Sequence, residues 1–331
     1  MPYHVVMAIT SGYRGRFAPT PSGPLHMGSL LTALLSYLDA RAHDGVWMLR
    51  IDDLDAARCD PAHTDTIRHQ LDAHGLAWDG PVYRQSQAGS RYREALATLR
   101  QADRIYGCDC TRRRLREHAP AGPFGPVYDG HCARRHLLTD APDSALALRM
   151  RVPPGGAQLA DDWHGPLVAD WQADIGDFVL QRRDGIPGYA LASAVDEAAM
   201  GITHVVRGSD LLHATFMHWC VLDALGLPRP RSRHGPLLVR ADGAKLSKQN
   251  HAAPLVTGAA AANLLACCRI LEVVPDGAER ADDPAAIVAG AVAIWRERSA
   301  QRVPPQRIVW TEETADSGIF GHAGTLGAGP L

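Results

Sequence analysis

Lysine is almost missing from this chain of 331 residues. Among 34 basic residues only two are lysines, Lys245 and Lys248, and both belong to the pentapeptide KLSKQ. Arginine supplies nearly all the positive charge. Two lysines this close together therefore favour a site that needs compact, mobile ammonium groups rather than the wide guanidinium fork. The alternative is that the two lysines cluster by chance.

Long apolar runs and a large excess of charge of one sign are missing too. No run of about 18 apolar residues occurs, which argues against a membrane-spanning helix, and the first residues do not have the pattern of a secretion signal. With 46% hydrophobic and 21% charged residues, we expect a soluble, cytoplasmic protein of two or three compact units. The formal net charge is −2, so any contact with nucleic acid must come from local basic patches.

The cysteines do not suit a disulfide framework, because seven is an odd number in a long chain. Metal binding or buried thiols fit better, and Cys108, Cys110 and Cys132 lie close together in the sequence. The other four have no partner spacing, and we expect them to be buried small residues or surface thiols: Cys59, Cys220, Cys267 and Cys268.

Strand and helix patterns alternate in the first part of the chain, as a parallel sheet requires, and they return after an interruption. The expected strands are residues 14–17, 46–51, 177–182 and 202–206, and the expected helices are residues 29–38, 66–75, 90–103 and 211–225.

The interrupting stretch, residues 106–174, differs in composition. It holds three cysteines, segments rich in proline and glycine, and only short apolar runs, so we expect an insertion with its own small fold. The sheet is then one domain cut into residues 1–105 and 175–255, followed by a helical stub at 256–310. Residues 311–331 are rich in glycine, and we expect a disordered tail there.

A histidine and a glycine, His26 and Gly28, stand at the entrance to the first expected helix. Helix amino ends bind phosphates because their unpaired N–H groups and the helix dipole both favour negative charge. A pair of this kind is more often only a helix cap. Far downstream, a turn presents Lys245 and Lys248 in a loop that can close over a triphosphate, unless it is a solvated turn. The joint occurrence is far more specific than either part.

These two motifs resemble the HIGH and KMSKS signatures of class I aminoacyl-tRNA synthetases. HMGS at residues 26–29 matches the first signature, and KLSKQ at residues 245–249 matches the second. Within that class, four segments look like the glutamyl-queuosine tRNA(Asp) synthetase family: RFAPTPSGPLHMGSLLTALLSYLDAR, MLRIDDLD, THVVRGSDLL and KLSKQNHA. The resemblance extends from about residue 13 to about residue 305.

The resemblance implies an α/β fold, namely a Rossmann-like class I synthetase catalytic core with a zinc-containing insertion and a short C-terminal helical stub. It implies that ATP activates glutamate to glutamyl-adenylate without tRNA. Glutamate then moves to the queuosine base in the anticodon loop of tRNA(Asp). The implied partners are L-glutamate, ATP with Mg²⁺, and tRNA(Asp) that contains queuosine. We expect a monomer with no membrane partner.

Carried over residue by residue, the resemblance assigns four residues to ATP and eight to glutamate. The ATP residues are His26, Gly28, Lys245 and Lys248. The glutamate residues are Arg16, Phe17, Ala18, Pro19, Thr20, Asp52, Tyr189 and Arg207. The charges suit a ligand with two carboxylates and one ammonium group, because the arginines supply forked donors and the aspartate a counter-charge. Taken alone, either arginine would more often be a surface charge.

Two positions depart from the family's pattern. The family usually has RIED where this chain has RIDD, so the carboxylate at Asp52 is one methylene shorter. Ala190 stands where relatives often carry a larger polar side chain. Neither change removes a type of charge, so both bear on the fine geometry of amino-acid recognition rather than on ATP use.

A zinc site is the third expected feature. Zn²⁺ prefers four tetrahedral ligands, and Cys108, Cys110 and Cys132 are one ligand short. General chemistry nominates His131, because phenolate ligands are uncommon, whereas the resemblance implies Tyr128. Zinc would stabilise an insertion that is poor in apolar residues. The alternatives are unligated thiols or a degraded site without metal.

Rival functions stay open. They are a glutamyl-tRNA synthetase that lacks its tail and charges the acceptor end, a catalytically silent zinc-containing RNA-binding module, and a nucleotidyltransferase for another small acid. The 82 residues after the KLSKQ loop are too few for the large anticodon-binding region expected of the first rival. Basic clusters at 112–116 and 134–135 either contact RNA phosphates or form solvated faces. Five other histidines are expected at the surface: His43, His63, His69, His74 and His164.

Overall fold

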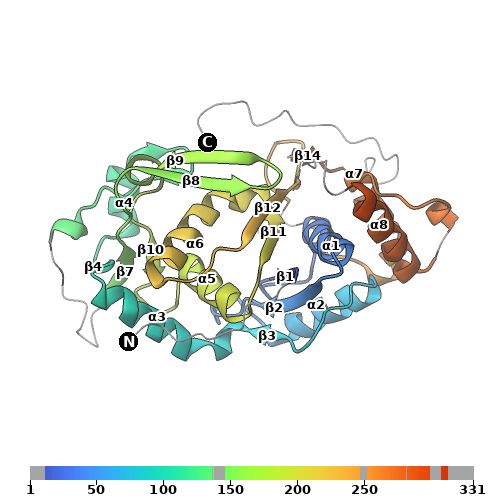
Figure 1. Cartoon of the computed structure of the whole chain (residues 1–331), viewed down its shortest axis with the longest axis horizontal. Helices are drawn as coiled ribbons and strands as arrows, with labels where there is room; N and C mark the ends of the chain where they lie inside the picture. The colour runs from blue at the N-terminus through green and yellow to red at the C-terminus, as the bar shows by residue number, and fades with distance from the viewer. Residues whose placement is uncertain are drawn as a thin grey trace.

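The computed structural model describes most of the chain, namely residues 12–135, 137, 146–246, 252–280, 282–298 and 307–311. Figure 1 shows an elongated molecule with strands and helices from both halves of the chain at its centre. A lobe from the middle of the chain lies at one end, and two late helices lie at the other. In the described ranges, no helix is long and apolar enough to cross a membrane.

The centre begins with three parallel strands, β1 (Arg14–Phe17), β2 (Val46–Ile51) and β3 (Tyr83–Arg84). Parallel neighbours need a crossover, and α1 (Met27–Ala42) and α2 (Pro61–Ala73) supply one each. The predicted strands at 14–17 and 46–51 have these bounds. Helix α2 begins earlier than predicted because Asp60 caps it, accepting the N–H of Ala62 at 2.9 Å, and proline occupies its first turn.

Helix α1 is held against the sheet by a leucine face with the three- and four-residue spacing of an amphipathic helix. Full burial of one such side chain contributes roughly 1.5–3 kcal/mol. The leucines, all at most 2% exposed, are Leu30, Leu31, Leu34, Leu35 and Leu38. The contact is close, because a β-carbon at Gly235 would stand 2.2 Å from a methyl group of Leu35. Only glycine fits where this later strand passes the helix.

The central sheet region continues with strands from much later in the chain. β11 (His204–Gly208) and β12 (Arg231–Gly235) are parallel, and α6 (Leu212–Leu225) lies between them in the sequence. Thr203 donates its backbone N–H to the carbonyl of Arg14 at 3.0 Å, so β11 starts beside β1. Helix α5 (Tyr189–Ala199) precedes β11 and packs against α6. The strand predicted at 202–206 and the helix predicted at 211–225 are both present, shifted by no more than two residues.

The middle of the chain adds an antiparallel sheet and two hairpins. Its elements are α3 (Gly89–Gln101), β4 (Ile105–Cys108), α4 (Arg112–His118), β5 (Ala121–Gly122), β6 (Gly125–Pro126), β7 (Ala147–Met150), β8 (Gly156–Asp161), β9 (Gly165–Asp170) and β10 (Val179–Gln181). Strand β7 lies between β4 and β10. The β8–β9 hairpin joins β12, where Ser232 pairs with Asp161. The hairpin within residues 106–174 therefore extends the sheet of the second half.

Two late helices cover α1. α7 (Ala260–Leu271) and α8 (Pro284–Arg298) pack against it and against each other. Cys267 and Cys268 are completely buried in this core and Cys220 is buried in α6, which is the first of the two alternatives expected for them. A short strand, β14 (Arg307–Val309), pairs in parallel with β13 (Leu237–Val239), where no strand was predicted. Beyond Thr311, the predicted tail lies outside the described residues.

The prediction of a surface position is wrong for His74. This residue follows α2 and is 0% exposed. Its Nδ1 lies 2.6 Å from the carbonyl oxygen of Gln70, and its Nε2 lies 3.1 Å from the amide nitrogen of Asn263 in α7. Burial lowers the pKa of His74. The error arises because a helix nearly 200 residues further on covers this position, and no local pattern indicates that contact.

Candidate active site

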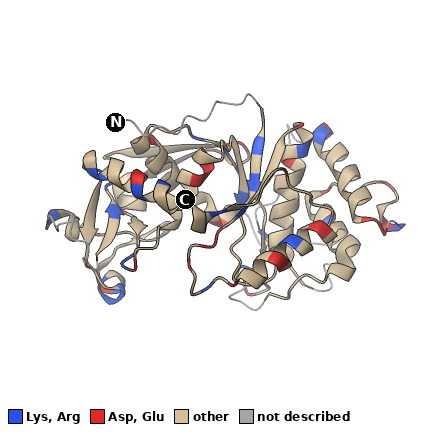
Figure 2. Ribbon diagram, turned by 90° about the horizontal axis from the view of Figure 1, so that it is seen from below, with Lys and Arg blue, Asp and Glu red and all other residues tan. Residues whose placement is uncertain are grey.

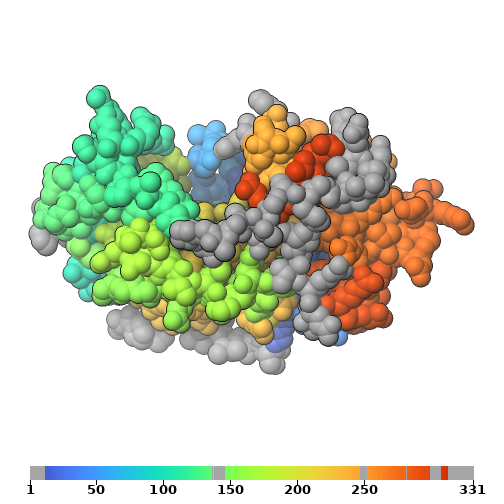
Figure 3. Space-filling model, turned by 90° about the horizontal axis from the view of Figure 1, so that it is seen from above, coloured from blue at the N-terminus to red at the C-terminus, as the bar shows by residue number. Residues whose placement is uncertain are grey.

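A cavity of about 300 Å³ lies where β1 and β11 end, beside the amino end of α1. The carboxyl ends of strands are where open α/β sheets place ligands. In the space-filling view, blue atoms from early in the chain lie recessed between green atoms of the middle segment and orange atoms of a later one (Figure 3). Ten predicted site residues line the cavity: Arg16, Phe17, Ala18, Pro19, Thr20, His26, Gly28, Tyr189, Arg207 and Lys245.

The two sequence motifs meet at Gly28. A β-carbon there would stand 3.2 Å from the ring of His26 and 3.5 Å from the carbonyl oxygen of Leu246, which follows Lys245. His26 caps α1, because its Nδ1 accepts the N–H of Ser29 at 3.3 Å. A phosphate at this end of the cavity would meet the positive end of the helix dipole. Lys248 lies outside the described residues.

Lys245 forms an ion pair with Asp210, and both residues line the cavity. The lysine side chain is 45% exposed and the aspartate side chain 24% exposed. A pair this open to water contributes about 0–1 kcal/mol. A ligand with several negative charges, such as a polyphosphate, can therefore replace Asp210 as the partner of the Lys245 ammonium group at a small cost in free energy.

Arg16 lies under the cavity and pairs with a buried glutamate. Its Nε and Nη2 donate to Oε1 of Glu197 at 3.0 and 2.6 Å, and its Nη1 donates to the carbonyl oxygen of Val206 at 3.3 Å. Burial alone would raise the pKa of Glu197, but the charge of Arg16 and those of other nearby basic groups together outweigh that effect, and the pKa falls to about 2. Glu197 is therefore ionised at neutral pH, and Arg16 already has one carboxylate partner.

Asp52 is not among the residues that line the cavity. Its carboxylate faces Arg50, whose Nε and Nη2 donate to its two oxygens at 2.6 and 3.1 Å. The Arg50 side chain is completely buried and also donates to the hydroxyl of Ser193 at 3.1 Å. Burial raises the pKa of Asp52 in spite of the arginine beside it. The structure thus brings Asp52 near the site but pairs it within the protein.

Arg207 is 5% exposed and lines the cavity, yet its hydrogen-bond partners are all neutral. Nη1 lies 3.1 Å from the hydroxyl of Tyr189 and 3.2 Å from Nδ1 of His218. Nη2 donates to Thr215 at 2.5 Å, and Nε donates to Nε2 of His234 at 3.2 Å. In the described part of the chain, no carboxylate pairs with Arg207. The charge of Arg207 helps to lower the pKa of Glu197, but its guanidinium makes no direct bond to a carboxylate in the described residues, so it is suited to an anionic ligand.

Apart from Tyr189, the side chains that contact the two cavity arginines were not predicted. They lie on α5 (Glu197), α6 (Thr215 and His218) and β12 (His234). One signal was available, because Asp196 and Glu197 interrupt an otherwise apolar helix, and acids in such a helix are rarely buried without partners. The threonine and the histidines carry no comparable signal in the sequence.

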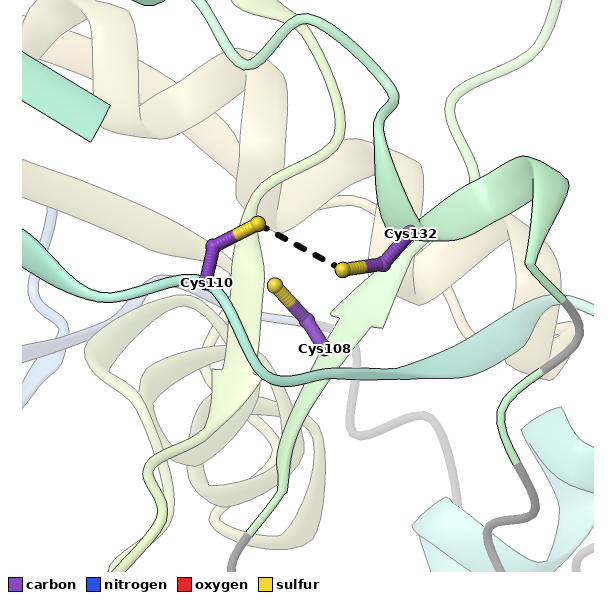
Figure 4. Close-up of side chains that lie close together, drawn as sticks. All are labelled: Cys108, Cys110 and Cys132. Atoms are coloured by element: carbon purple, nitrogen blue, oxygen red, sulfur yellow. Dashed lines mark hydrogen bonds between the residues drawn. The ribbon is translucent and has the colours of Figure 1, made fainter. Parts of the chain in front are cut away.

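Cys108, Cys110 and Cys132 form a compact cluster at the end of β4, and their sulfur atoms lie within 4.8 Å of one another (Figure 4). Cys110 Sγ is 3.4 Å from Cys132 Sγ. Tetrahedral zinc with Zn–S bonds of about 2.3 Å needs sulfur atoms about 3.8 Å apart. Burial raises the pKa of Cys132 to about 11. At Cys108, hydrogen bonds from Tyr128 and Arg149 outweigh burial and lower the pKa.

Tyr128, rather than His131, faces the cluster. The Tyr128 hydroxyl oxygen lies 3.5 Å from Cys108 Sγ and 3.4 Å from Cys110 Sγ, and the backbone N–H of Cys132 donates to it at 2.8 Å. The guanidinium of Arg149 lies 3.7 Å from the centre of the Tyr128 ring. In the described ranges, the compact group of possible ligand atoms contains the three cysteines and leaves out His131. The donor set of three sulfurs and one phenol oxygen fits a tetrahedral zinc ion.

The family of tRNA synthetases class I (E and Q), catalytic domain, matches residues 13–260. A glutamyl-Q tRNA(Asp) synthetase of Methylococcus capsulatus is 42% identical over 295 residues, which cover 89% of this chain and 94% of that protein. A protein of the same name from Klebsiella pneumoniae is 48% identical over 248 residues, covering 75% and 81%.

Among solved structures, glutamate-tRNA synthetase from Elizabethkingia anophelis matches with a TM-score of 0.72 and 24% identity, over 92% of this chain and 69% of that one. This likeness supports a common fold. The family match extends over most of the chain, and the named relatives align along most of both sequences. The chain therefore belongs to the class I tRNA synthetases (E and Q) and, among them, to the glutamyl-Q tRNA(Asp) synthetase family.

Proposed function

We propose that this protein activates glutamate with ATP, without tRNA, and then transfers the glutamyl group to the queuosine base in the anticodon loop of tRNA(Asp). The observation that carries the proposal is the meeting of the two signature motifs at one cavity, where Gly28 and Leu246 approach each other. Relatives that bear the corresponding name are 42% and 48% identical to this chain.

The nucleotide occupies the end of the cavity next to α1. His26 and Gly28 place the phosphates at the amino end of that helix, and Lys245 binds them together with Lys248 of the same motif. Mg²⁺ enters with the nucleotide. A carboxylate oxygen of glutamate attacks the α-phosphorus, the bond to the bridging oxygen of pyrophosphate breaks, and pyrophosphate leaves with that electron pair. Catalysis here is alignment plus charge stabilisation, so the chain need not supply a nucleophile.

Glutamate occupies the neighbouring end, against residues 16–20, Tyr189 and Arg207. The guanidinium of Arg207 binds a carboxylate, because it is buried and has only neutral partners in the described part of the chain. Asp52, which pairs with Arg50, supplies the counter-charge for the ammonium group, and its shorter side chain requires a bridging water.

Zinc has a structural role in this proposal. Where it is bound, its ligands are Cys108, Cys110, Tyr128 and Cys132. It cross-links the end of β4 to the segment near residue 132. Both lie within residues 106–174, which we propose as an insertion distinct from the catalytic core. We further propose a cytoplasmic monomer with domain limits at 105, 174, 255 and 310. Figure 2 shows lysine and arginine interspersed with acidic residues along the ribbon, so the tRNA contact relies on local clusters.

The test is a transfer reaction with labelled glutamate, ATP and tRNA(Asp) that either contains or lacks queuosine. After transfer, the tRNA is digested so that the terminal adenosine is separated from the anticodon fragment. Periodate is not used before transfer, because it would open the diol of queuosine as well as the terminal diol. Label that depends on queuosine and survives digestion of the acceptor end supports the proposal. Label that is independent of queuosine and removed with the terminal adenosine contradicts it and indicates an acceptor-end synthetase.

A further inference from the structure

A buried hydrogen-bonded chain connects the β8–β9 hairpin to the cavity. Asp161, the last residue of β8, lies 2.6 Å from Nδ1 of His234 through its Oδ2. On the other side of the ring, Nε2 of His234 accepts from Nε of Arg207 at 3.2 Å and lies 3.1 Å from the hydroxyl of Thr215. Asp161, His234, Arg207 and Thr215 are all at most 5% exposed.

The hydrogen bonds fix which ring nitrogen carries the proton. Backbone N–H groups of Trp163 and His164 donate to Oδ1 of Asp161 at 3.0 and 2.9 Å. Burial, the largest effect, opposes ionisation of Asp161, but the interaction with His234 and these two backbone bonds together outweigh it and lower the pKa. An ionised aspartate accepts only, so Nδ1 of His234 must be the donor. Nε2 is then a lone-pair acceptor that faces the N–H of Arg207.

This arrangement orients the guanidinium plane of Arg207. The group has five N–H donors in a rigid fork. His234, Thr215, Tyr189 and His218 take four of them. Tyr189 is 43% exposed and lines the cavity, so a ligand can replace it more easily than the three buried partners. The donors that remain for a ligand are therefore on the terminal nitrogens, and their direction depends on the bond between Nε and His234.

We propose that Asp161 and His234 are positioning residues that hold Arg207 in the orientation needed to bind a carboxylate of the amino-acid substrate. The inference rests on the proposed function, and it gives the β8–β9 hairpin a part in substrate affinity although Asp161 and His234 do not line the cavity. Aspartate-to-asparagine replacement tests the proton arrangement, because an asparagine amide can donate to Nδ1. His234 would then carry its proton on Nε2, and two donors would face each other.

The experiment measures glutamate-dependent ATP–pyrophosphate exchange without tRNA for the whole protein and its variants. For Asp161→Asn, we expect the KM for glutamate to rise about tenfold, as expected when a hydrogen bond to a charged group is lost, with the KM for ATP unchanged. His234→Gln keeps an acceptor near Arg207 and should retain most of the affinity, whereas His234→Leu should lose it as Asp161→Asn does. This pair keeps the proposal testable if Asp161→Asn does not fold.

Asp39→Asn is the matched control, since Asp39 is also a buried carboxylate but pairs with Arg233, which does not line the cavity, whereas Asp161 connects through His234 to Arg207, which does. It should lower the melting temperature without a selective change in the KM for glutamate. The inference is overturned if Asp161→Asn or His234→Leu leaves that KM unchanged, or if the KM values for glutamate and ATP rise together as the melting temperature falls. Absence of exchange in the unmodified protein would refute the proposed function instead.

Discussion

Glu197 Oε1 lies 2.6 Å from Nη2 of Arg16, and the two side chains are 2% and 4% exposed. The residues are 181 positions apart in the sequence. One belongs to β1 in the first half of the chain and the other to α5 in the second half. This ion pair therefore joins the two halves of the interrupted core directly beneath the cavity, and the nearby Arg50 adds a second positive charge, 3.9 Å from the same oxygen.

Glu197→Gln should destabilise the protein by about 3–5 kcal/mol, because it leaves the buried charge of Arg16 without its partner. Urea unfolding monitored by tryptophan fluorescence measures the change. Glu94→Gln, at an exposed position on α3, is the control and should stay within about 0.5 kcal/mol of the unmodified protein. Equal stability of the two variants would show that the ion pair does not hold the halves together.

Arg207→Lys should raise the KM for glutamate by about 100-fold or more, because an ammonium group cannot make the paired N–H contacts of a guanidinium. The KM for ATP should change little. Steady-state pyrophosphate exchange measures both constants. Arg229→Lys, an exposed arginine that pairs with Asp223, should behave like the unmodified protein. An unchanged glutamate KM in Arg207→Lys would remove Arg207 from the proposed substrate site.

The purified protein should contain about one zinc ion per chain, and Cys132→Ser should lose it and melt at a lower temperature. Cys267→Ser, which changes a buried cysteine in α7 outside the cluster, should keep its zinc. Tyr128→Phe should weaken zinc binding and His131→Ala should not. Elemental analysis measures the zinc content of each variant, and competition with a chelator measures its affinity for zinc. Full zinc content in Cys132→Ser would contradict the assignment of the ligands.

Stability should fall as the pH is lowered from about 7 to about 5. Burial lowers the pKa of both His204 and His234 to about 4, whereas in an unfolded chain a histidine titrates near 6.5. The unfolded state therefore binds more protons in this window, so the stability present above pH 6.5 is lost as the pH falls towards 4. Glu197 adds a loss only below about pH 4.5, because its folded pKa is about 2.

Urea unfolding at pH 7, 6 and 5 tests this dependence. His204→Gln should flatten part of the slope, and His69→Gln, at an exposed position on α2, should leave it as it is. A stability that stays constant between pH 7 and 5 would contradict the account. So would an equal effect of the two substitutions on the slope.

Much of the fold followed from local patterns. The strand at 46–51 is apolar and bounded by turns, and the leucine face of α1 repeats at helical spacing, so both elements were predicted close to their observed bounds. The position of the β8–β9 hairpin was not predictable in this way. In the structure, buried and exposed residues alternate along β8, as in a strand with one covered face. The pairing of Ser232 with Asp161, which no local pattern reveals, decides which sheet the hairpin joins.

The candidate site likewise contains residues that local sequence predicted and residues that it did not. His26, Gly28 and Lys245 stand in motifs that are recognisable in sequence, and all three line the cavity. Glu197 and His234 act through contacts with arginines from distant strands, so their importance appears only when the chain is folded. Asp52 differs from them, because the resemblance assigned it to glutamate, whereas the hydrogen-bond partner of its carboxylate is Arg50 in the strand that ends just before it.

The most direct measurement of the central claim is pyrophosphate exchange by the unmodified protein without tRNA, with glutamate, aspartate or glutamine as the amino acid. A single cavity that takes ATP at the end of α1 and glutamate at Arg207 predicts exchange with glutamate, much weaker exchange with the other two, and a large loss in Lys245→Ala. No exchange at saturating glutamate, or equal exchange with all three amino acids, would contradict it.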